Sequence, residues 1–377
     1  MRIGYDAKRL FNNFTGLGNY SRFIVKGIHQ YFPTARIFLF TPKIKNHPEV
    51  KDFLESEHYT TLQPAGWLQA LKLGSYWRTA LLAREAREQQ VDVFHGLSHE
   101  LPQGIARVCK AVVTIHDLIF LRYPQFYSAI DRWIYTKKVK HACKEAHVII
   151  AISEQTKSDL IEYLGVPAKK IKVVYQGCHP NFERTFDKDS LLAIKGKYNL
   201  PDRFLLNVGT IEPRKNALLI LQAYNHLPKA ARMPLVMVGR PTAYLQTIKD
   251  FAKAHQLEEY ITYLHAVDFK DLPAIYQMSE AFIYPSLFEG FGIPLVEAIT
   301  CKTPVITSTG SCFSEAAGPH ALYVSPTDAV ALAQAIQVVC QDATKRQEMV
   351  EGSLHYIQRF SEERIANDIM DVYRSVI

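Results

Sequence analysis

Short apolar runs alternate with longer amphipathic or polar stretches along the first 175 residues. The runs predict buried strands at Arg2–Asp6, Ile37–Phe40, Val91–Phe94, Ala111–Ile115, Val148–Ile152 and Val173–Tyr175. Helical patterns lie between them, at about Asn19–Tyr31, Thr79–Gln90 and Tyr127–Glu145. Short buried strands separated by helices are typical of a parallel sheet that is covered on both faces.

The same alternation starts again after residue 200. Its apolar runs predict strands at Phe204–Val208, Leu235–Val238, Ile261–Leu264, Ala281–Tyr284, Pro304–Thr307 and Leu322–Val324. Ser361 is a good N-cap for a last amphipathic helix that ends near Ile377. We therefore expect an α/β protein with two Rossmann-like doubly wound domains. The expected limits are 1–180 and 198–358, with a connection at 181–197 and a C-terminal helix at 359–377.

Length and composition agree with this organisation. A chain of 377 residues is too long for one ordinary core, and 48% hydrophobic and 21% charged residues are globular values. The six cysteines include no Cys-x-x-Cys pair, which argues against a zinc or disulfide framework. No stretch reaches 18 apolar residues, and the first residues form a strand instead of a signal peptide, so a cytoplasmic location is expected.

Charge is distributed unevenly. Residues 1–200 contain 29 Lys and Arg against 18 Asp and Glu, whereas the remainder contains 15 against 19. A basic first half indicates an anionic partner, and a membrane surface fits better than nucleic acid because no nucleic-acid recognition motif is present. The segment Pro64–Ala83 carries Trp67, Leu71 and Trp77 among basic residues, which predicts either an interfacial amphipathic helix or ordinary core packing.

The richest chemical signal is the stretch 282–297. A buried strand leads into a loop with Gly290 and Gly292, and Pro294 then stands where a helix can begin. Such a loop presents backbone amides to an anion, yet Glu289 and Glu297 flank it. Carboxylates would repel a bare phosphate, so the expected ligand carries phosphate in one part and hydroxyls in another, as a nucleotide sugar does.

A second signal lies upstream. Arg214 and Lys215 follow the strand Phe204–Val208 and precede a helical pattern that begins at Ala217. Ligands of open α/β sheets bind at the carboxyl ends of strands, and two adjacent cations can neutralise a diphosphate. An isolated Arg-Lys pair is more often a solvated turn, and it is the combination with the Glu289–Glu297 loop that favours a ligand site.

Together these segments resemble the retaining GT-B glycosyltransferases of family 4, in particular the bacterial mannosyltransferase-like branch that builds O-antigen. The resemblance rests on Gly-Thr-Ile-Glu-Pro-Arg-Lys-Asn at 209–216 and on the spacing from Glu289 to Glu297. It extends to Thr-Gly-Leu-Gly-Asn-Tyr at 15–20, Thr-Ile-His-Asp-Leu at 114–118 and Ala-Ile-Ser at 151–153.

The resemblance implies that the C-terminal helix at 359–377 crosses back to pack on the first domain. It also implies functional roles for individual residues. His116 would touch the transferred sugar, Arg214 and Lys215 would stabilise the leaving diphosphate, and Glu289 would accept hydrogen bonds from sugar hydroxyls. The remaining donor-binding positions are expected to be Gly16, Gly18, Gly209, Val267, Phe291, Gly292, Ile293, Leu295 and Glu297, with Glu315 as a further acidic residue. His95 and Asp117 are candidates for contact with the acceptor.

No metal is expected. His95 and His99 have a spacing that binds zinc on a helix, but Gly96 and a preceding strand place them in a loop. The one Asp-x-Asp sequence, at 187–189, lies in the polar connection.

The expected donor is GDP-mannose, followed by UDP-hexoses, and the expected acceptor is a glycan or a lipid-diphosphate-linked oligosaccharide, which suits a peripheral position on the membrane. Two other classes remain open: a GT-B phosphorylase or epimerase, and a non-catalytic carbohydrate-binding subunit.

Overall fold

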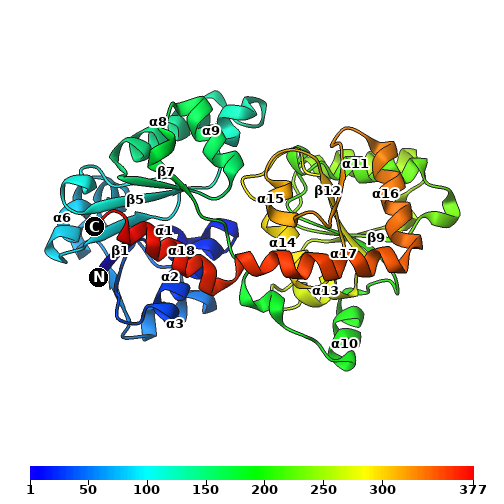
Figure 1. Ribbon diagram of the computed structural model, residues 1–377, viewed down its shortest axis with the longest axis horizontal. Coiled ribbons are helices and arrows are strands. Elements are labelled where there is room, and N and C mark those ends of the chain that lie inside the picture. Colours follow the sequence, from blue (N-terminus) through cyan, green and yellow to red (C-terminus); the bar gives the residue numbers. More distant parts are fainter. The chain divides into compact units, whose positions relative to one another are not determined.

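The computed structural model describes all 377 residues, which fold into two α/β units (Figure 1). The first unit contains residues 1–177 together with 360–377, and the second contains residues 178–359. The segment 181–197, expected as a connection, lies in the second unit and contains most of a helix, α10 (Lys188–Tyr198).

The first unit is built on a seven-stranded parallel sheet of order β3-β2-β1-β4-β5-β6-β7. The strands are β1 (Arg2–Asp6), β2 (Arg36–Phe40), β3 (Tyr59–Leu62), β4 (Val93–Gly96), β5 (Lys110–Ile115), β6 (Val148–Ala151) and β7 (Ile171–Val173). Strand β3 was not predicted, and β7 lies two residues before the predicted run. The expected parallel sheet is confirmed.

Helices cover both faces of this sheet. They are α1 (Lys8–Asn12), α2 (Gly16–Tyr31), α3 (Lys51–Glu55), α4 (Gly66–Ala70), α5 (Gly74–Tyr76), α6 (Leu82–Glu88), α7 (Ile119–Arg122), α8 (Ala129–Glu145), α9 (Glu154–Leu164) and α18 (Glu362–Arg374). One turn of π-helix, Trp77–Leu81, joins α5 to α6. The C-terminal helix α18 lies beside α2 (Figure 1).

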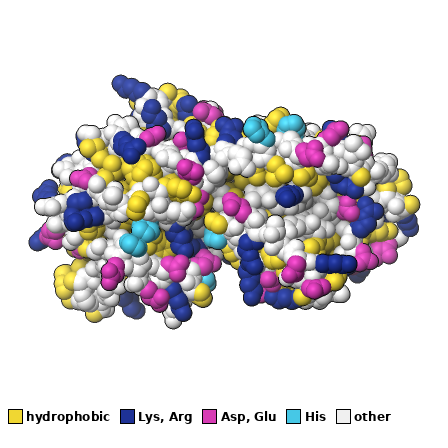
Figure 2. Space-filling view, turned by 60° about the horizontal axis from the view of Figure 1, so that its bottom comes forward, with side chains coloured by type: hydrophobic (Ala, Val, Ile, Leu, Met, Phe, Trp, Pro, Cys, Tyr) yellow, Lys and Arg dark blue, Asp and Glu magenta, His cyan; other side chains and the backbone are white.

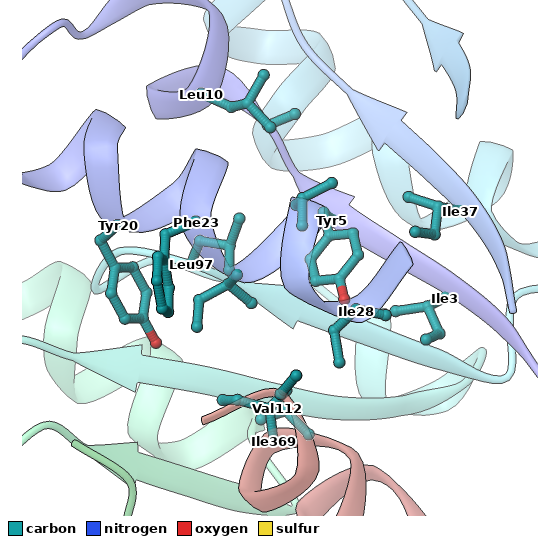
Figure 3. Packing of buried hydrophobic residues seen from close by; sticks show 14 of the residues in the cluster. Ile3, Tyr5, Leu10, Tyr20, Phe23, Ile28, Ile37, Leu97, Val112 and Ile369 are labelled. Atoms are coloured by element: carbon teal, nitrogen blue, oxygen red, sulfur yellow. The ribbon is translucent and has the colours of Figure 1, made fainter. Parts of the chain in front are cut away.

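Alternation along the strands divides the core of the first unit into two layers. Tyr5 of β1 and Val112 of β5 face α2 and α18, and Figure 3 shows them with Ile28 and Ile369 from those helices. Neighbouring strand residues such as Val113 point to the opposite face, where α6, α8 and α9 pack. Successive side chains of a strand point to opposite faces, so a sheet buried on both sides needs apolar residues at consecutive positions.

The second unit is built on a six-stranded parallel sheet of order β10-β9-β8-β11-β12-β13. Its strands are β8 (Leu205–Val208), β9 (Leu235–Val238), β10 (Ile261–Leu264), β11 (Ala281–Tyr284), β12 (Val305–Ser308) and β13 (Leu322–Val324). After α10, its helices are α11 (Ala217–His226), α12 (Tyr244–Ala254), α13 (Leu272–Met278), α14 (Ile293–Thr300), α15 (Phe313–Ala317), α16 (Ala329–Gln341) and α17 (Ala343–Tyr356). All six predicted strands are present within one residue of their expected limits.

The segment Pro64–Ala83 forms several short elements instead of one amphipathic helix. Leu68 and Trp77 are buried in the core of the first unit. Trp67 and Leu71 are 62% and 63% exposed, and Leu73 and Tyr76 are also exposed. The structure therefore confirms core packing for Leu68 and Trp77, and the single amphipathic helix expected as the alternative does not form. No helix of the chain is long and apolar enough to cross a bilayer.

Candidate active site

The order of strands in the second unit reverses between β8 and β11. In open α/β sheets, ligands bind beyond the carboxyl ends of the strands at such a reversal. The loop after β8 carries Arg214 and Lys215, and the loop after β11 carries Glu289. The amide of Leu287 donates to the carbonyl of Arg214 at 2.9 Å, which ties the two loops together.

The two cations converge on one carboxylate. Lys215 Nζ and an Arg214 guanidinium nitrogen each lie 2.7 Å from Oε1 of Glu289. Arg214 also donates to the carbonyl of Phe288 at 2.7 Å and to Glu212 at 2.6 Å. These contacts hold both cationic side chains at the carboxyl edge of the sheet, and each is only 16% exposed.

The charge state of Glu289 follows from this geometry. Burial alone would raise its pKa, but Lys215 and Arg214 outweigh burial and lower the pKa of Glu289 to about 2. The carboxylate is therefore ionised at neutral pH and can only accept hydrogen bonds. The same contacts raise the pKa of Arg214 above its usual value although burial opposes this change.

Two neighbours of Glu289 were missed by sequence reasoning. The hydroxyls of Tyr284 and Ser286 donate to Glu289 Oε1 at 3.0 and 2.7 Å. Both residues belong to the Tyr-Pro-Ser run that ends β11. The available signal was the presence of hydroxyl side chains at the end of an apolar strand. The two hydroxyls hold the carboxylate of Glu289 in place, and this carboxylate in turn holds Arg214 and Lys215.

The helix α14 begins beside this cluster, as predicted. Gly292 occupies its N-cap with φ 90°, a left-handed conformation that favours glycine, and Pro294 stands in the first turn. The amides of Gly292 and Ile293 head the helix, where no preceding turn supplies a carbonyl. The side chains of Phe291 and Leu295 are buried. The amide of Leu295, a predicted donor-binding position, already donates to the carbonyl of Gly292 at 2.9 Å.

Glu297 lies one turn into α14. Its carboxylate accepts a hydrogen bond from the hydroxyl of Tyr276 at 3.1 Å. Burial raises the pKa of Glu297 to about 7, although the Tyr276 hydrogen bond and Lys215 act in the opposite direction. The two predicted carboxylates of this loop therefore differ in charge state near neutral pH, because only Glu289 has cations in contact.

The other positions predicted in this unit lie around the same edge. Gly209 follows β8 with φ 152°, close to Lys215. Val267 lies in the loop after β10, and Glu315 lies on α15. Ser311, which was not predicted, accepts from the amide of Glu289 at 3.2 Å, so the loop before α15 braces the Glu289 loop.

In the first unit, Gly16 and Gly18 lie in the first turn of α2, three residues before the expected helix start. Asn13 caps this turn, because its side-chain oxygen accepts from the amides of Thr15 and Gly18 at 2.9 and 3.2 Å. A Cβ at Gly18 would lie 1.7 Å from the carbonyl oxygen of Asn13, whereas a Cβ at Gly16 would contact nothing. Packing against Asn13 therefore requires a glycine at position 18, whereas the space next to Gly16 is open.

His116 follows β5 and is nearly buried. Its Nε2 lies 2.9 Å from the carbonyl of Leu97 and its Nδ1 lies 3.0 Å from the amide nitrogen of Gln176. Only an N–H can bond a carbonyl, so Nε2 carries the proton and Nδ1 accepts. Burial lowers the pKa of His116 to about 3, which keeps the ring neutral. Asp117 accepts from the amide of Ile119, the first residue of α7, at 3.1 Å.

The structure does not support acceptor contact by His95. This residue lies inside β4 and not in the following loop, and its side chain is fully buried. Its nitrogens lie 2.7 Å from the hydroxyl of Tyr373 and 2.8 Å from that of Thr114. Because Tyr373 belongs to α18, His95 instead joins the sheet to the C-terminal helix.

Metal-ligating side chains do not gather anywhere in the chain: no group of three or more His, Cys, Asp or Glu could hold an ion. Asp187 of the Asp-x-Asp sequence accepts from the amide of Ser190 at 2.8 Å and caps α10.

Two family models match the chain. Residues 32–182 match the model described as Glycosyltransferase Family 4, and residues 192–355 match that described as Glycosyl transferases group 1.

Curated relatives of the chain include named glycosyltransferases. O-antigen chain mannosyltransferase B of Escherichia coli is 29% identical over 99% of this chain and 100% of its own length. O-antigen chain mannosyltransferase RfbU of Salmonella typhimurium is 30% identical over 76% of this chain and 74% of its own length.

Solved structures share the fold. HepE of Anabaena in complex with UDP and glucose superposes with a TM-score of 0.74 and 19% identity over the whole of both chains. Sucrose-phosphate synthase of Thermosynechococcus elongatus superposes with a TM-score of 0.76 and 20% identity, over 100% of this chain and 98% of the other.

Proposed function

The chain belongs to glycosyltransferase family 4, and on that premise we propose that it transfers mannose from GDP-mannose to a growing surface polysaccharide. The names of the two O-antigen mannosyltransferases support mannose, and a UDP-hexose is the alternative donor. The proposed acceptor is a glycan or a lipid-diphosphate-linked oligosaccharide.

One observation carries this proposal: Arg214 and Lys215 are both held by Glu289 at the strand reversal of the second unit. Two cations fixed in a partly buried site match the negative charge that a departing diphosphate develops. Groups that are oriented before the reaction stabilise such charge strongly because they need no reorganisation. With this positive charge in place, the proposed reaction requires no metal ion.

The proposed mechanism retains configuration by attack on the face that the diphosphate leaves. The bond between sugar C1 and the diphosphate oxygen breaks, the acceptor hydroxyl oxygen bonds C1, and the departing phosphate oxygen takes the hydroxyl proton. Arg214 and Lys215 stabilise the diphosphate, with the amides of Gly292 and Ile293 as further donors. Glu289 accepts from sugar hydroxyls and Glu297 accepts from the ribose.

The test combines donor binding with turnover. Thermal unfolding is measured with GDP, UDP, ADP and their sugar conjugates, with and without EDTA. A ligand at 100 times its Kd stabilises the folded protein by about 2.7 kcal/mol. We expect a selective shift with GDP and GDP-mannose that EDTA leaves unchanged. A shift of the unfolding midpoint with UDP and UDP-hexoses alone would show that the donor is a UDP-hexose instead of GDP-mannose. A shift that EDTA abolishes would contradict the metal-independent reaction.

Turnover tests the assigned residues. Lys215→Ala should lower transfer by a factor of about 100 or more, the usual effect of losing one charge-stabilising donor. The matched control is Lys249→Ala on the exposed surface of α12. Near-normal transfer by Lys215→Ala would contradict the mechanism. Release of free sugar or a need for inorganic phosphate would favour the epimerase or phosphorylase alternatives.

We further propose that the first unit contacts a membrane surface through Trp67, Leu71, Leu73 and Tyr76, named here the apolar ridge. These side chains are exposed and lie beside Lys72 in one short segment. Figure 2 shows exposed hydrophobic and basic side chains interspersed on one face of the molecule, whereas the residues of the apolar ridge are identified by their exposed fractions. Apolar side chains that enter a bilayer and Lys or Arg side chains that attract anionic headgroups reinforce each other.

A further inference from the structure

One oxygen of Glu289 has more partners than it can satisfy. Four side chains place a nitrogen or a hydroxyl oxygen 2.7–3.0 Å from its Oε1: Arg214, Lys215, Tyr284 and Ser286. A carboxylate has about four lone-pair sites on its two oxygens, so about two belong to Oε1. The four side chains therefore compete for this oxygen, and the loss of one partner strengthens the contacts of the others.

Tyr284 lies between Lys215 and Glu289. Its hydroxyl oxygen is 2.5 Å from Nζ of Lys215 and 3.0 Å from Oε1 of Glu289. An ammonium group can only donate and an ionised carboxylate can only accept. The hydroxyl therefore accepts from Lys215 and gives its own proton to Glu289, so Tyr284 holds Lys215 independently of the ion pair.

The hydroxyl of Tyr284 has a fixed position. The side chain is 1% exposed, and its ring centroid lies 5.6 Å from that of Phe282 and 6.3 Å from that of Phe313. The backbone carbonyl of Tyr284 accepts from Oγ1 of Thr307 at 2.8 Å, which ties the end of β11 to β12. Burial raises the pKa of Tyr284 well above its usual value, so the hydroxyl keeps the proton that it donates.

Of the two cations, Lys215 is the one that can move. Three acceptors fix the guanidinium of Arg214: the carbonyl of Phe288 and the carboxylates of Glu212 and Glu289. The ammonium of Lys215 has only two partners and stands at the end of a flexible four-carbon stem. A diphosphate that enters the site can therefore attract Lys215 without a rearrangement of Arg214.

The charges of the site balance before a ligand arrives. Arg214 and Lys215 carry two positive charges, and Glu212 and Glu289 carry two negative charges. A diphosphate would meet a neutral cluster as long as Lys215 remains on Glu289. Movement of Lys215 to the phosphate oxygens brings opposite charges together, so the diphosphate favours this movement.

The same movement would leave Glu289 with fewer partners. Removal of one partner from a buried ion pair is strongly destabilising because the remaining charge is uncompensated. The hydroxyls of Tyr284 and Ser286 reduce this cost, since both still donate to the carboxylate after Lys215 has left. The hydroxyl of Tyr284 should therefore contribute more to the diphosphate complex than to the free protein.

We propose that Tyr284 is a positioning residue of the donor site. Donor binding replaces the Lys215–Glu289 ion pair with a contact between Lys215 and the diphosphate, and the hydroxyl of Tyr284 holds both side chains during this exchange. The inference rests on the proposed function for the presence of a diphosphate in this site, but not for the sugar or the base.

Calorimetric titration of the full chain with inorganic pyrophosphate, GDP and UDP tests the exchange. Tyr284→Phe keeps the ring and removes only the hydroxyl, and it should raise the Kd of the tightest of these ligands about tenfold, which corresponds to about 1.4 kcal/mol. The matched control is Tyr224→Phe, which removes the hydroxyl of another buried tyrosine of the second unit, bonded to the carbonyl of Met233 at 2.8 Å. This control should bind the ligand as the wild type does.

A double-mutant cycle distinguishes positioning of Lys215 from a purely structural role. If Tyr284 acts through Lys215, Tyr284→Phe should change the Kd less than twofold in a Lys215→Ala background. A tenfold effect in that background would overturn the inference, because the hydroxyl would then act without Lys215. Unfolding midpoints establish that the variants fold. Ser286→Ala removes another donor to Glu289 and should give the same pattern, so it replaces Tyr284→Phe if that variant does not fold.

The outcomes separate this inference from the proposed function. Wild-type affinity in both Tyr284→Phe and Ser286→Ala would refute the exchange and leave the assignment of GDP-mannose intact. A coupled cycle together with selective binding of UDP would refute the proposed donor and support the exchange. A wild-type protein that binds none of the three ligands would overturn the inference, because no diphosphate would then enter the site.

Discussion

Lys215 and Glu289 form a nearly buried ion pair, with Nζ 2.7 Å from Oε1 of the carboxylate. Arg214 reaches the same oxygen, so one carboxylate holds two cations that follow a different strand. A nearly buried cation pair without a counter-charge would be costly. Glu289 therefore balances the charge of Lys215 and Arg214 and also keeps both side chains in place when no diphosphate is present. Substitution of Glu289 should accordingly affect both stability and activity.

Glu289→Gln should lower both stability and transfer. The amide leaves Arg214 and Lys215 without a counter-charge, and breaking a buried pair costs about 3–5 kcal/mol. Urea unfolding at pH 7 measures this loss, and transfer should fall by a factor of about 100 or more. The control is Glu351→Gln on the exposed face of α17. A variant of wild-type stability would show that the ion pairs contribute nothing.

The same residue should make stability depend on pH below 4.5. The pKa of Glu289 is lowered to about 2 in the folded protein from an ordinary 4.5. A lowered folded-state pKa contributes stability that is complete above pH 4.5 and is lost as the pH falls through about 2. Unfolding free energies measured from pH 5 to pH 3 should therefore decline more steeply in the wild type than in Glu289→Gln. Parallel curves would contradict the assigned charge state.

Glu297 should give the opposite dependence. Burial raises its pKa to about 7, so the folded protein binds a proton that the unfolded chain releases near pH 4.5. Its contribution to stability therefore falls as the pH rises from 4.5 through about 7, and it is lost above that pH. Glu297→Gln should remove this fall and unfold at a higher midpoint than the wild type at pH 8.

Donor binding supplies a second readout for Glu297. An ionised carboxylate is the stronger acceptor for the ribose hydroxyls, so donor affinity in the wild type should rise as the pH passes 7. Titrations from pH 6 to pH 8 with GDP-mannose test this expectation. Affinity that rises equally in Glu297→Gln would assign the effect to another group.

Sequence was sufficient where a signal is local. Arg214 and Lys215 follow one apolar strand and Glu289 follows another, so a parallel sheet brings them to the same edge without knowledge of their contacts. The start of α14 near Pro294 was equally local. Strand β3 was not predicted because it lies at the edge of the sheet, where its residues are exposed, as Thr60 is, or only half-buried, and therefore form no apolar run.

Sequence was insufficient where partners lie far apart in the chain. His95 reads as a loop residue, yet its ring is held by Tyr373, 278 residues away. Both ring nitrogens of His116 likewise form hydrogen bonds with residues distant in the chain, Leu97 and Gln176. The early start of α2 was missed because glycines are poor helix formers, and the Asn13 cap that compensates is a matter of geometry.

Gly16 and Gly18 form a matched pair that separates packing from ligand contact. Gly18→Ala places a methyl group against the Asn13 carbonyl and should destabilise the protein by about 2 kcal/mol or more. Gly16→Ala meets open space and should leave stability unchanged. If a ligand approaches this turn, Gly16→Ala should still raise a substrate KM. Normal kinetics in Gly16→Ala would remove Gly16 from the site.

The apolar ridge should decide membrane binding. Burying a side chain such as Trp or Leu contributes about 1.5–3 kcal/mol, so Trp67→Ser with Leu71→Ser should weaken vesicle binding by a factor of about 100 or more. Co-sedimentation with vesicles that contain anionic phosphatidylglycerol measures the loss. Leu54→Ser with Ile161→Ser is the matched control, because both side chains are exposed but lie outside the ridge. Equal sedimentation of the two double variants would show that the ridge does not contact lipid. Binding that persists in neutral vesicles but is lost in the ridge variant would assign the attraction to the apolar side chains alone, since electrostatic attraction needs anionic headgroups.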